Sequence, residues 1–240
     1  MGLGIRKVDK NHFLIRSYGM KKIQFSWLII FISKLCICQE PETQSTGISG
    51  FYDTQNRESL QQITGLYFRV NPYDREFSEF LNQLINDPAI SNKTLDKRTD
   101  STFFYFKGEY KNFSPFFFKA IRTEIILAET EIALDDSTGK SDTIMAYQLL
   151  GYTAGSNQGK EDVKQEFIKF KKRIKKKFWS IDPTEFKNGT ETTGQIQNYF
   201  LPLYTISPLT AAWGKLTASN ECIFVITLRM KVKQNIAILP

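Results

Sequence analysis

A segment near the C-terminal part of the chain has apolar residues at the spacing of a strand. Between residues 221 and 234 every second position is apolar, namely Cys222, Phe224, Ile226, Leu228, Met230 and Val232, and Ile223 and Val225 between them are apolar as well. Such alternation is typical of a strand with one buried face. The aromatic and β-branched segments 66–70 and 101–110 predict two further strands, the second with a possible bulge at Gly108.

Two segments have the apolar spacing of helices instead. In the segment 160–178 the apolar positions follow one another at intervals of four, three, four and four, at Val163, Phe167, Phe170, Ile174 and Phe178. This spacing places them along one stripe of a helix. A second apolar set begins after Asp74, a residue suited to capping, and stops near Asp87 and Pro88. We predict amphipathic helices over 74–87 and 160–178.

The segment 116–134 is compatible with two structures. Ser114 and Pro115 precede it and suit the start of a helix. A polar loop, 135–142, joins it to an extended apolar segment, which instead suits a long β-hairpin. We favour the hairpin, and a helix for its first arm is the alternative.

These elements together predict an α+β fold. We expect a single domain, residues 57–240, in which two amphipathic helices pack on a mainly antiparallel sheet. Residues 39–56 are polar and rich in turn-forming residues, so we expect a flexible linker there. No internal repeat of fixed period occurs in the sequence.

The segment before this linker has the pattern of a secretory signal peptide. Lys21 and Lys22 precede an apolar run, 23–33, which is shorter than the roughly 20 residues that span a bilayer. Cys36 and Cys38 would occupy the small-residue positions before cleavage. We therefore expect residues 1–38 to be a leader, with translation beginning at Met20 and the mature chain at Gln39.

The predicted cleavage places the protein outside the cytoplasm, in the periplasm or secreted. Lysines followed by an apolar run are typical of exported bacterial proteins. A lipid anchor is less favoured, because Leu35 and Ile37, rather than small residues, precede the two leader cysteines.

Removal of the leader changes the charge and the available chemistry. The whole chain has a net charge of +7, but 25 bases and 24 acids remain after residue 38, a net charge of +1. This balance gives no support for nucleic-acid binding. The cut also removes His12, the one histidine, and leaves Cys222 as the one cysteine. Ser-His-Asp, Cys-His and His/Cys zinc sites are then excluded, and we predict no metal and no cofactor.

The strongest local feature is a basic run. Seven of the nine residues from Lys169 to Lys177 are basic. Such a run can bind anionic lipid, polysaccharide or an acidic protein partner. It can also be a solvated helix face, because cations are favoured near a helix C-terminus. We select four lysines as the candidate binding residues: Lys171, Lys172, Lys175 and Lys176.

Paired carboxylates are the remaining catalytic chemistry open to this composition. On a regular strand Glu129 and Glu131 would share one face, about 6–7 Å apart along the backbone. That separation is near the one that an inverting glycosidase requires. Two other motifs are incomplete. Ser137 to Lys140 matches S-x-x-K without its partner motifs, and residues 155–160 lack the phosphate-loop spacing.

The sequence thus predicts an exported protein that acts by binding or assembly at the cell envelope, without catalysis. Its expected partner is an anionic envelope surface or another protein, and we expect no transmembrane segment in the mature chain. The alternative is a carboxylate-dependent hydrolase of envelope polysaccharide, with Glu129 or Glu131 as acid or base. A structural component held by protein contacts is a third possibility.

Overall fold

The computed structural model describes residues 54–73, 76–97, 104–111, 117, 119–135, 140–175, 178–201 and 207–233. All of them belong to one compact unit, Thr43–Pro240. The predicted leader, most of the predicted linker and the S-x-x-K serine lie outside the described residues.

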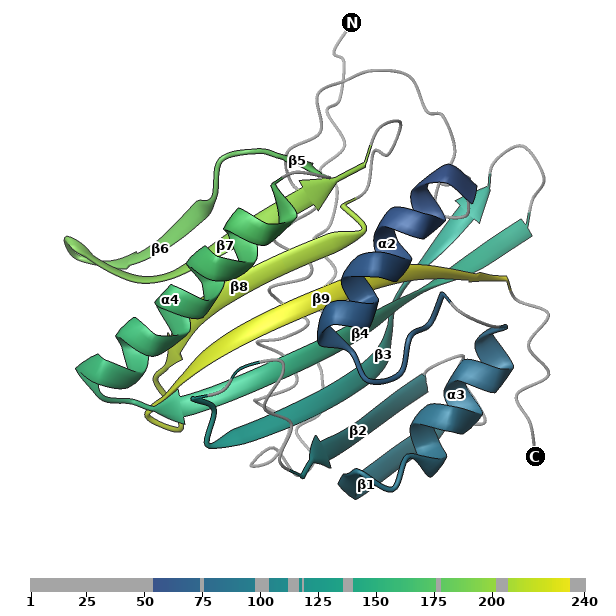
Figure 1. Cartoon of the computed structure of the whole chain (residues 1–240), viewed down its shortest axis with the longest axis horizontal. Coiled ribbons are helices and arrows are strands. Elements are labelled where there is room, and N and C mark those ends of the chain that lie inside the picture. Colours follow the sequence, from purple (N-terminus) through teal and green to yellow (C-terminus); the bar gives the residue numbers. More distant parts are fainter. Residues whose placement is uncertain are drawn as a thin grey trace, which may run out of the picture. The chain divides into compact units, whose positions relative to one another are not determined.

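The described strands form one antiparallel sheet of nine strands (Figure 1). Its order is β1-β2-β3-β4-β9-β8-β7-β5, and β6 also pairs with β7. The strands are β1 Ile90–Lys97, β2 Phe104–Tyr110, β3 Arg122–Asp135, β4 Lys140–Ala154, β5 Trp179–Ser180, β6 Thr184–Asn188, β7 Glu191–Phe200, β8 Leu209–Leu216 and β9 Glu221–Lys233. At the centre of the sheet β9 pairs along its whole length with β4, from Asp142 to Ala154.

Three helices cover one face of this sheet: α2 (Thr54–Tyr67), α3 (Phe77–Asn86) and α4 (Asn157–Ile174) (Figure 1). Aromatic contacts join them to the strands and to each other. Tyr147 of β4 packs against Phe68 and Phe80, with ring centroids 4.7 and 5.1 Å apart. Phe170 of α4 lies 5.1 Å from the ring of Tyr67 at the end of α2. The core therefore lies between the helices and this face.

The structure confirms the antiparallel α+β fold and most of the predicted elements. The segment 116–134 contains a strand, β3, and β3 and β4 form the favoured long hairpin. In β9 the apolar positions from Cys222 to Met230 face the core, as the alternation predicts. Helix α3 is present at Phe77–Asn86 and α4 at Asn157–Ile174, so α4 ends four residues before the predicted position 178.

Two predictions from the sequence are wrong. The segment 66–70 is not a strand, because its first two residues end α2 and the rest follow it without strand structure. This helix, absent from the prediction, begins at Thr54 inside the predicted linker. The polar, glycine-containing segment after Pro183 indicates a loop-rich region, but it contains the hairpin of β6 and β7.

The predicted irregularity at Gly108 lies on the neighbouring strand. Asn92 and Lys93 of β1 together oppose Gly108 of β2, so the extra residue of the bulge belongs to β1. A Cβ atom at Gly108 would lie 2.2 Å from Cγ2 of Ile90. A larger residue at position 108 would therefore require the Ile90 side chain to move.

Candidate functional site

Helix α4 presents its cations to solvent because its apolar stripe fixes its orientation. Ser156 caps the helix, its Oγ accepting a hydrogen bond from the backbone N–H of Gly159 at 3.1 Å. The stripe is buried against β4, β8 and β9 at Gly159, Val163, Phe167, Phe170 and Ile174. The charged residues between these positions must then lie on the outer face.

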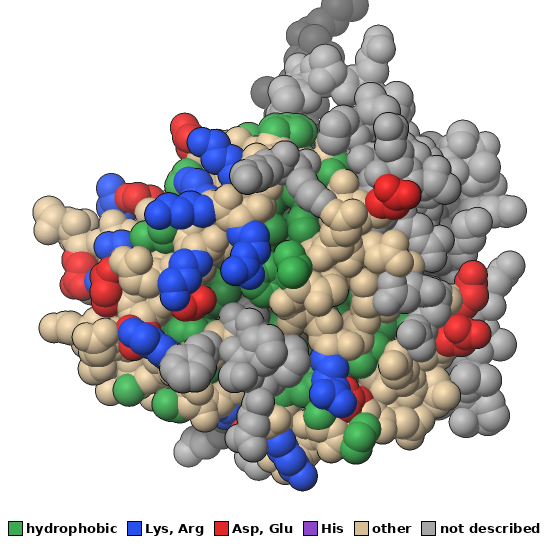
Figure 2. Space-filling view, viewed as in Figure 1, with side chains coloured by type: hydrophobic (Ala, Val, Ile, Leu, Met, Phe, Trp, Pro, Cys, Tyr) green, Lys and Arg blue, Asp and Glu red, His purple; other side chains and the backbone are tan. Residues whose placement is uncertain are grey.

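We call Lys171, Lys172, Arg173 and Lys175 the basic end of α4. Lys172, Arg173 and Lys175 are exposed and Lys171 is half-buried, while Lys176 lies outside the described residues. Figure 2, which views the molecule from the side of the helices, shows Lys and Arg side chains gathered on the half that α4 crosses.

The basic end differs from the rest of α4 in its pairing. Lys164 and Lys169 have acidic partners, at 3.8 Å from Glu161 and 2.6 Å from Glu166. Among the residues that the structure describes, no carboxylate lies within ion-pair distance of the basic end.

The helix itself accounts for part of this distribution. Unpaired carbonyl groups give a helix C-terminus a partial negative charge, and a cation there is stabilised by about 0.3–1 kcal/mol. Arg173 has a further structural contact, since its Nη1 donates to the hydroxyl of Tyr67 at 3.2 Å. The side chains of Lys171, Lys172 and Lys175 form no hydrogen bond or ion pair with the residues that the structure describes. Their charge therefore remains available to a ligand.

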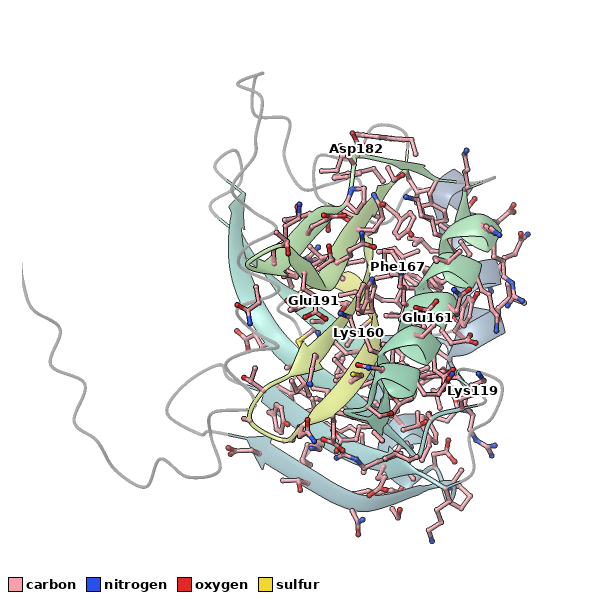
Figure 3. The ribbon with its side chains drawn as sticks, turned by 90° about the vertical axis from the view of Figure 1, so that its left-hand side faces the viewer. Lys119, Lys160, Glu161, Phe167, Asp182 and Glu191 are labelled. Carbon is pink, nitrogen blue, oxygen red and sulfur yellow. The ribbon has the colours of Figure 1, made fainter. Side chains whose placement is uncertain are left out.

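A polar groove of about 520 Å³ lies at the other end of α4, against β6, β7 and β8. It is lined by Asn157, Lys160, Glu161, Lys164, Glu185, Glu191, Thr192, Gln195 and Trp213. Figure 3 shows Lys160 and Glu191 pointing toward each other, and the two side chains form an ion pair. The indole N–H of Trp213 donates to Oε1 of Gln195 at 3.2 Å, and Nε2 of Gln195 donates to Glu185 at 2.8 Å.

Two carboxylates of this groove, those of Glu185 and Glu191, are favoured in their ionised form. The hydrogen bond from Lys160, followed by its charge, lowers the pKa of Glu191. Hydrogen bonds from Gln195 and Lys187 lower the pKa of Glu185. A general acid near neutral pH requires a raised pKa, so these groups are poorly suited to acid catalysis. The sequence pattern did not indicate this groove, because its residues come from four separate elements.

The register of β3 removes the spacing on which the carboxylate hypothesis depends. Glu129 pairs with Met145 and Glu131 with Ile144, which leaves Thr130 as the extra residue of a bulge. Paired residues of antiparallel strands share a face, whereas adjacent residues of one strand belong to opposite faces. Positions 129 and 131 therefore do not share a face, as a regular strand would require.

A buried ion network lies on the sheet face opposite the helices. The Glu124 carboxylate accepts hydrogen bonds from Arg122 at 2.6 Å and from the Tyr152 hydroxyl at 3.0 Å, and it pairs with Lys107 at 3.0 Å. Arg122 also donates to both carboxylate oxygens of Glu221. Burial, followed by the nearby Glu124 charge, raises the pKa of Tyr152 and keeps its hydroxyl a donor. Because these contacts join residues of β2, β3, β4 and β9, the network is explained as a structural clamp between the four strands.

Among the described residues no helix has the length and apolar character needed to cross a membrane. Comparison of the chain with protein-family models, with curated proteins and with solved structures gave no match.

Proposed function

We propose that this protein is an exported, non-enzymatic binding or assembly module that attaches to an anionic surface of the cell envelope through the basic end of α4. Lys171, Lys172 and Lys175 of the basic end, together with Lys176, which follows it in the sequence, make the main contacts. The periplasm or the cell exterior is its place of action.

The observation that supports this proposal is the absence of acidic partners around the basic end within the described part of the chain. Four cations occupy positions 171–175, while other lysines of the same helix are paired. Lysine close to an anionic surface contributes about 1 kcal/mol of binding free energy. Cations already neutralised by neighbouring carboxylates would contribute less.

The hydrolase alternative has no comparable support. It requires two carboxylates on one side of a cleft, and the β3 register gives Glu129 and Glu131 no shared face. The polar groove beside α4 contains carboxylates, but those of Glu185 and Glu191 have a lowered pKa.

The test compares adsorption of the full chain and of the variant K171Q/K172Q/K175Q/K176Q to an anionic polysaccharide, heparin, and to vesicles of phosphatidylcholine and phosphatidylglycerol in equal parts. At about 1 kcal/mol for each lysine, the variant should bind at least one of these probes more weakly by on the order of several hundredfold at low salt. Added salt should weaken wild-type binding, because surface charges are screened.

A second variant controls for total charge. K111Q/K164Q/K187Q/K215Q removes the same charge from four exposed lysines outside the basic end. It should retain most of the binding, and both variants should keep the wild-type melting temperature. Equal loss in the two variants, or no adsorption by the wild type, would overturn the proposal.

A further inference from the structure

Three segments of the chain share the acceptor motif for N-linked glycosylation. This motif, Asn-x-Ser/Thr with x other than proline, begins at Asn92, Asn112 and Asn188. Asn112 lies outside the described residues, whereas Asn92 and Asn188 are exposed. The threonines that complete these two motifs, Thr94 and Thr190, are exposed as well. Both described motifs therefore lie at the protein surface.

Asn188 lies at the end of the β6–β7 hairpin. It pairs with Glu191, the first residue of β7, so Gly189 and Thr190 form the turn. A Cβ atom at Gly189 would have no atom within 4 Å. Figure 1 shows the end of this hairpin projecting at the left of the view. The Asn188 side chain has no hydrogen-bond partner among the described residues, so a large group on its amide would displace no such contact.

Asn92 lies at the other edge of the sheet, in the bulge of β1. It has a φ of 51°, and its Nδ2 donates to Oε2 of Glu109 at 3.0 Å in an exposed contact. An amide nitrogen carries two protons, so this contact leaves one that a sugar can replace. Among the described strands β1 pairs with β2 alone and β6 with β7 alone. The two acceptors therefore lie on edge strands at opposite sides of the sheet.

We propose that Asn92 and Asn188 carry N-linked oligosaccharides, which cover these two edge strands. An unpaired strand edge can pair with another chain, and a bulky hydrophilic group hinders that approach. This inference rests on the export in the proposed function, because the motif is an acceptor in secreted proteins.

The attachment at Asn188 is compatible with binding through the basic end of α4. Asn188 pairs with Glu191, whose carboxylate forms an ion pair with Lys160 near the start of α4. From Lys160 to Lys175 the helix axis extends about 22 Å, at 1.5 Å for each residue. The oligosaccharide would therefore be attached at the far end of the helix from the lysines that bind the anionic surface.

The modification requires an oligosaccharide donor linked to a lipid diphosphate. The asparagine amide nitrogen forms a bond to the anomeric carbon of the first sugar, while the bond from that carbon to the diphosphate oxygen breaks. The amide gives up one proton, and the lipid diphosphate leaves with the electron pair of the broken bond. Nothing is oxidised or reduced, so the step needs no further reactant.

The experiment uses the full chain and the variants T94A, T94S, T190A and T190S, each recovered from the native cells. Peptide masses are measured before and after an amidase that removes N-linked oligosaccharides and leaves aspartate. The wild-type peptides that contain Asn92 and Asn188 should each carry the mass of one oligosaccharide. Each alanine variant should lose one of them. The serine variants are the matched controls, since they keep the motif and should keep the oligosaccharide.

The outcomes separate this inference from the proposed function. An unmodified Asn92 or Asn188, in a chain that begins at Gln39 outside the cytoplasm, would overturn the inference for that site and leave the proposed export standing. Unmodified sites in a cytoplasmic chain that retains residues 1–38 would overturn both. Equal loss in the serine and alanine variants would overturn the role of the motif. Amidase treatment should also increase self-association in sedimentation velocity, and no increase would overturn the covering of the edges.

Discussion

Replacing Gly159 by alanine should destabilise the protein, although alanine is the better helix former. Gly159 is the third residue of α4 and lies directly over the end of β4. A Cβ atom there would lie 1.9 Å from the backbone oxygen of Ala154 and 3.0 Å from Oγ1 of Thr153. Relief requires a backbone movement of about 1 Å, since non-bonded carbon–oxygen contacts are normally longer than 3 Å.

The magnitude follows from two opposed effects. Alanine gains about 1 kcal/mol over glycine in a helix interior. Overpacking against rigid backbone costs about 1–3 kcal/mol, and displacement of Gly159 would also weaken the Ser156 cap, which is worth about 1 kcal/mol. We expect G159A to lower the free energy of unfolding by about 2 kcal/mol.

Gly65 provides the matched control. It lies in α2, is exposed, and has no atom within 4 Å of the position that a Cβ would take. G65A should therefore raise the free energy of unfolding, by about 0.5–1 kcal/mol. Urea unfolding followed by far-UV circular dichroism measures both variants. A G159A protein as stable as the wild type would refute the steric reasoning, because helix propensity would then have outweighed the contact with β4.

The remaining predictions concern two carboxylates. E191Q should reduce stability at pH 7, because the contact with Lys160 lowers the pKa of Glu191 below its ordinary 4.5. The ion pair therefore stabilises the folded state fully above pH 4.5, and this stabilisation is lost as the pH falls through the lowered pKa. Wild type and E191Q should then converge in thermal melts at about pH 3, and a constant difference would contradict the assignment. E124Q should cost about 2–4 kcal/mol in urea unfolding, because it leaves Arg122 and Lys107 without their shared buried partner. Unchanged stability would show that Glu221 alone satisfies Arg122.

Elements with a single strong period could be predicted from the sequence. The apolar positions at every second residue of β9 and the apolar stripe of α4 each predict a buried face, and in both the structure has that face in the core. The exact ends of the helices and strands were harder to predict from the sequence. α4 stops at Ile174, yet Phe178 is still buried, and its backbone N–H donates to the carbonyl of Ile174. Burial at the expected spacing therefore did not require four more helical residues.

The errors came from segments with competing signals. Leu60, Ile63 and Tyr67 have helical spacing and are buried, but the aromatic and β-branched content of 66–70 favoured a strand. Those residues are apolar because they pack on the core from the end of α2. The β6–β7 hairpin was missed because β6 is mostly exposed and polar, although Gly189, with φ +61°, occupies the turn that Asn188-Gly189 indicates.

Only part of the candidate site could be predicted from the sequence. The basic run is local in sequence and could be read directly, whereas its lack of acidic partners depends on the tertiary structure. The bulge at Thr130, which separates the faces of Glu129 and Glu131, is invisible to a pattern that assumes a regular strand.

The central pairing of β4 with β9 constrains the order in which the sheet can form during folding. Gln148 and Thr227, which hydrogen-bond across the pair, are 79 residues apart, so this pairing closes a long loop. During synthesis the hairpin of β3 and β4 leaves the ribosome well before β9 does, and one side of β4 has no partner until then. An exported chain would meet the same delay at the far side of the membrane. The protein therefore has an interval in which an unpaired strand edge must be shielded from other chains, and a chaperone that holds extended segments would act in that interval.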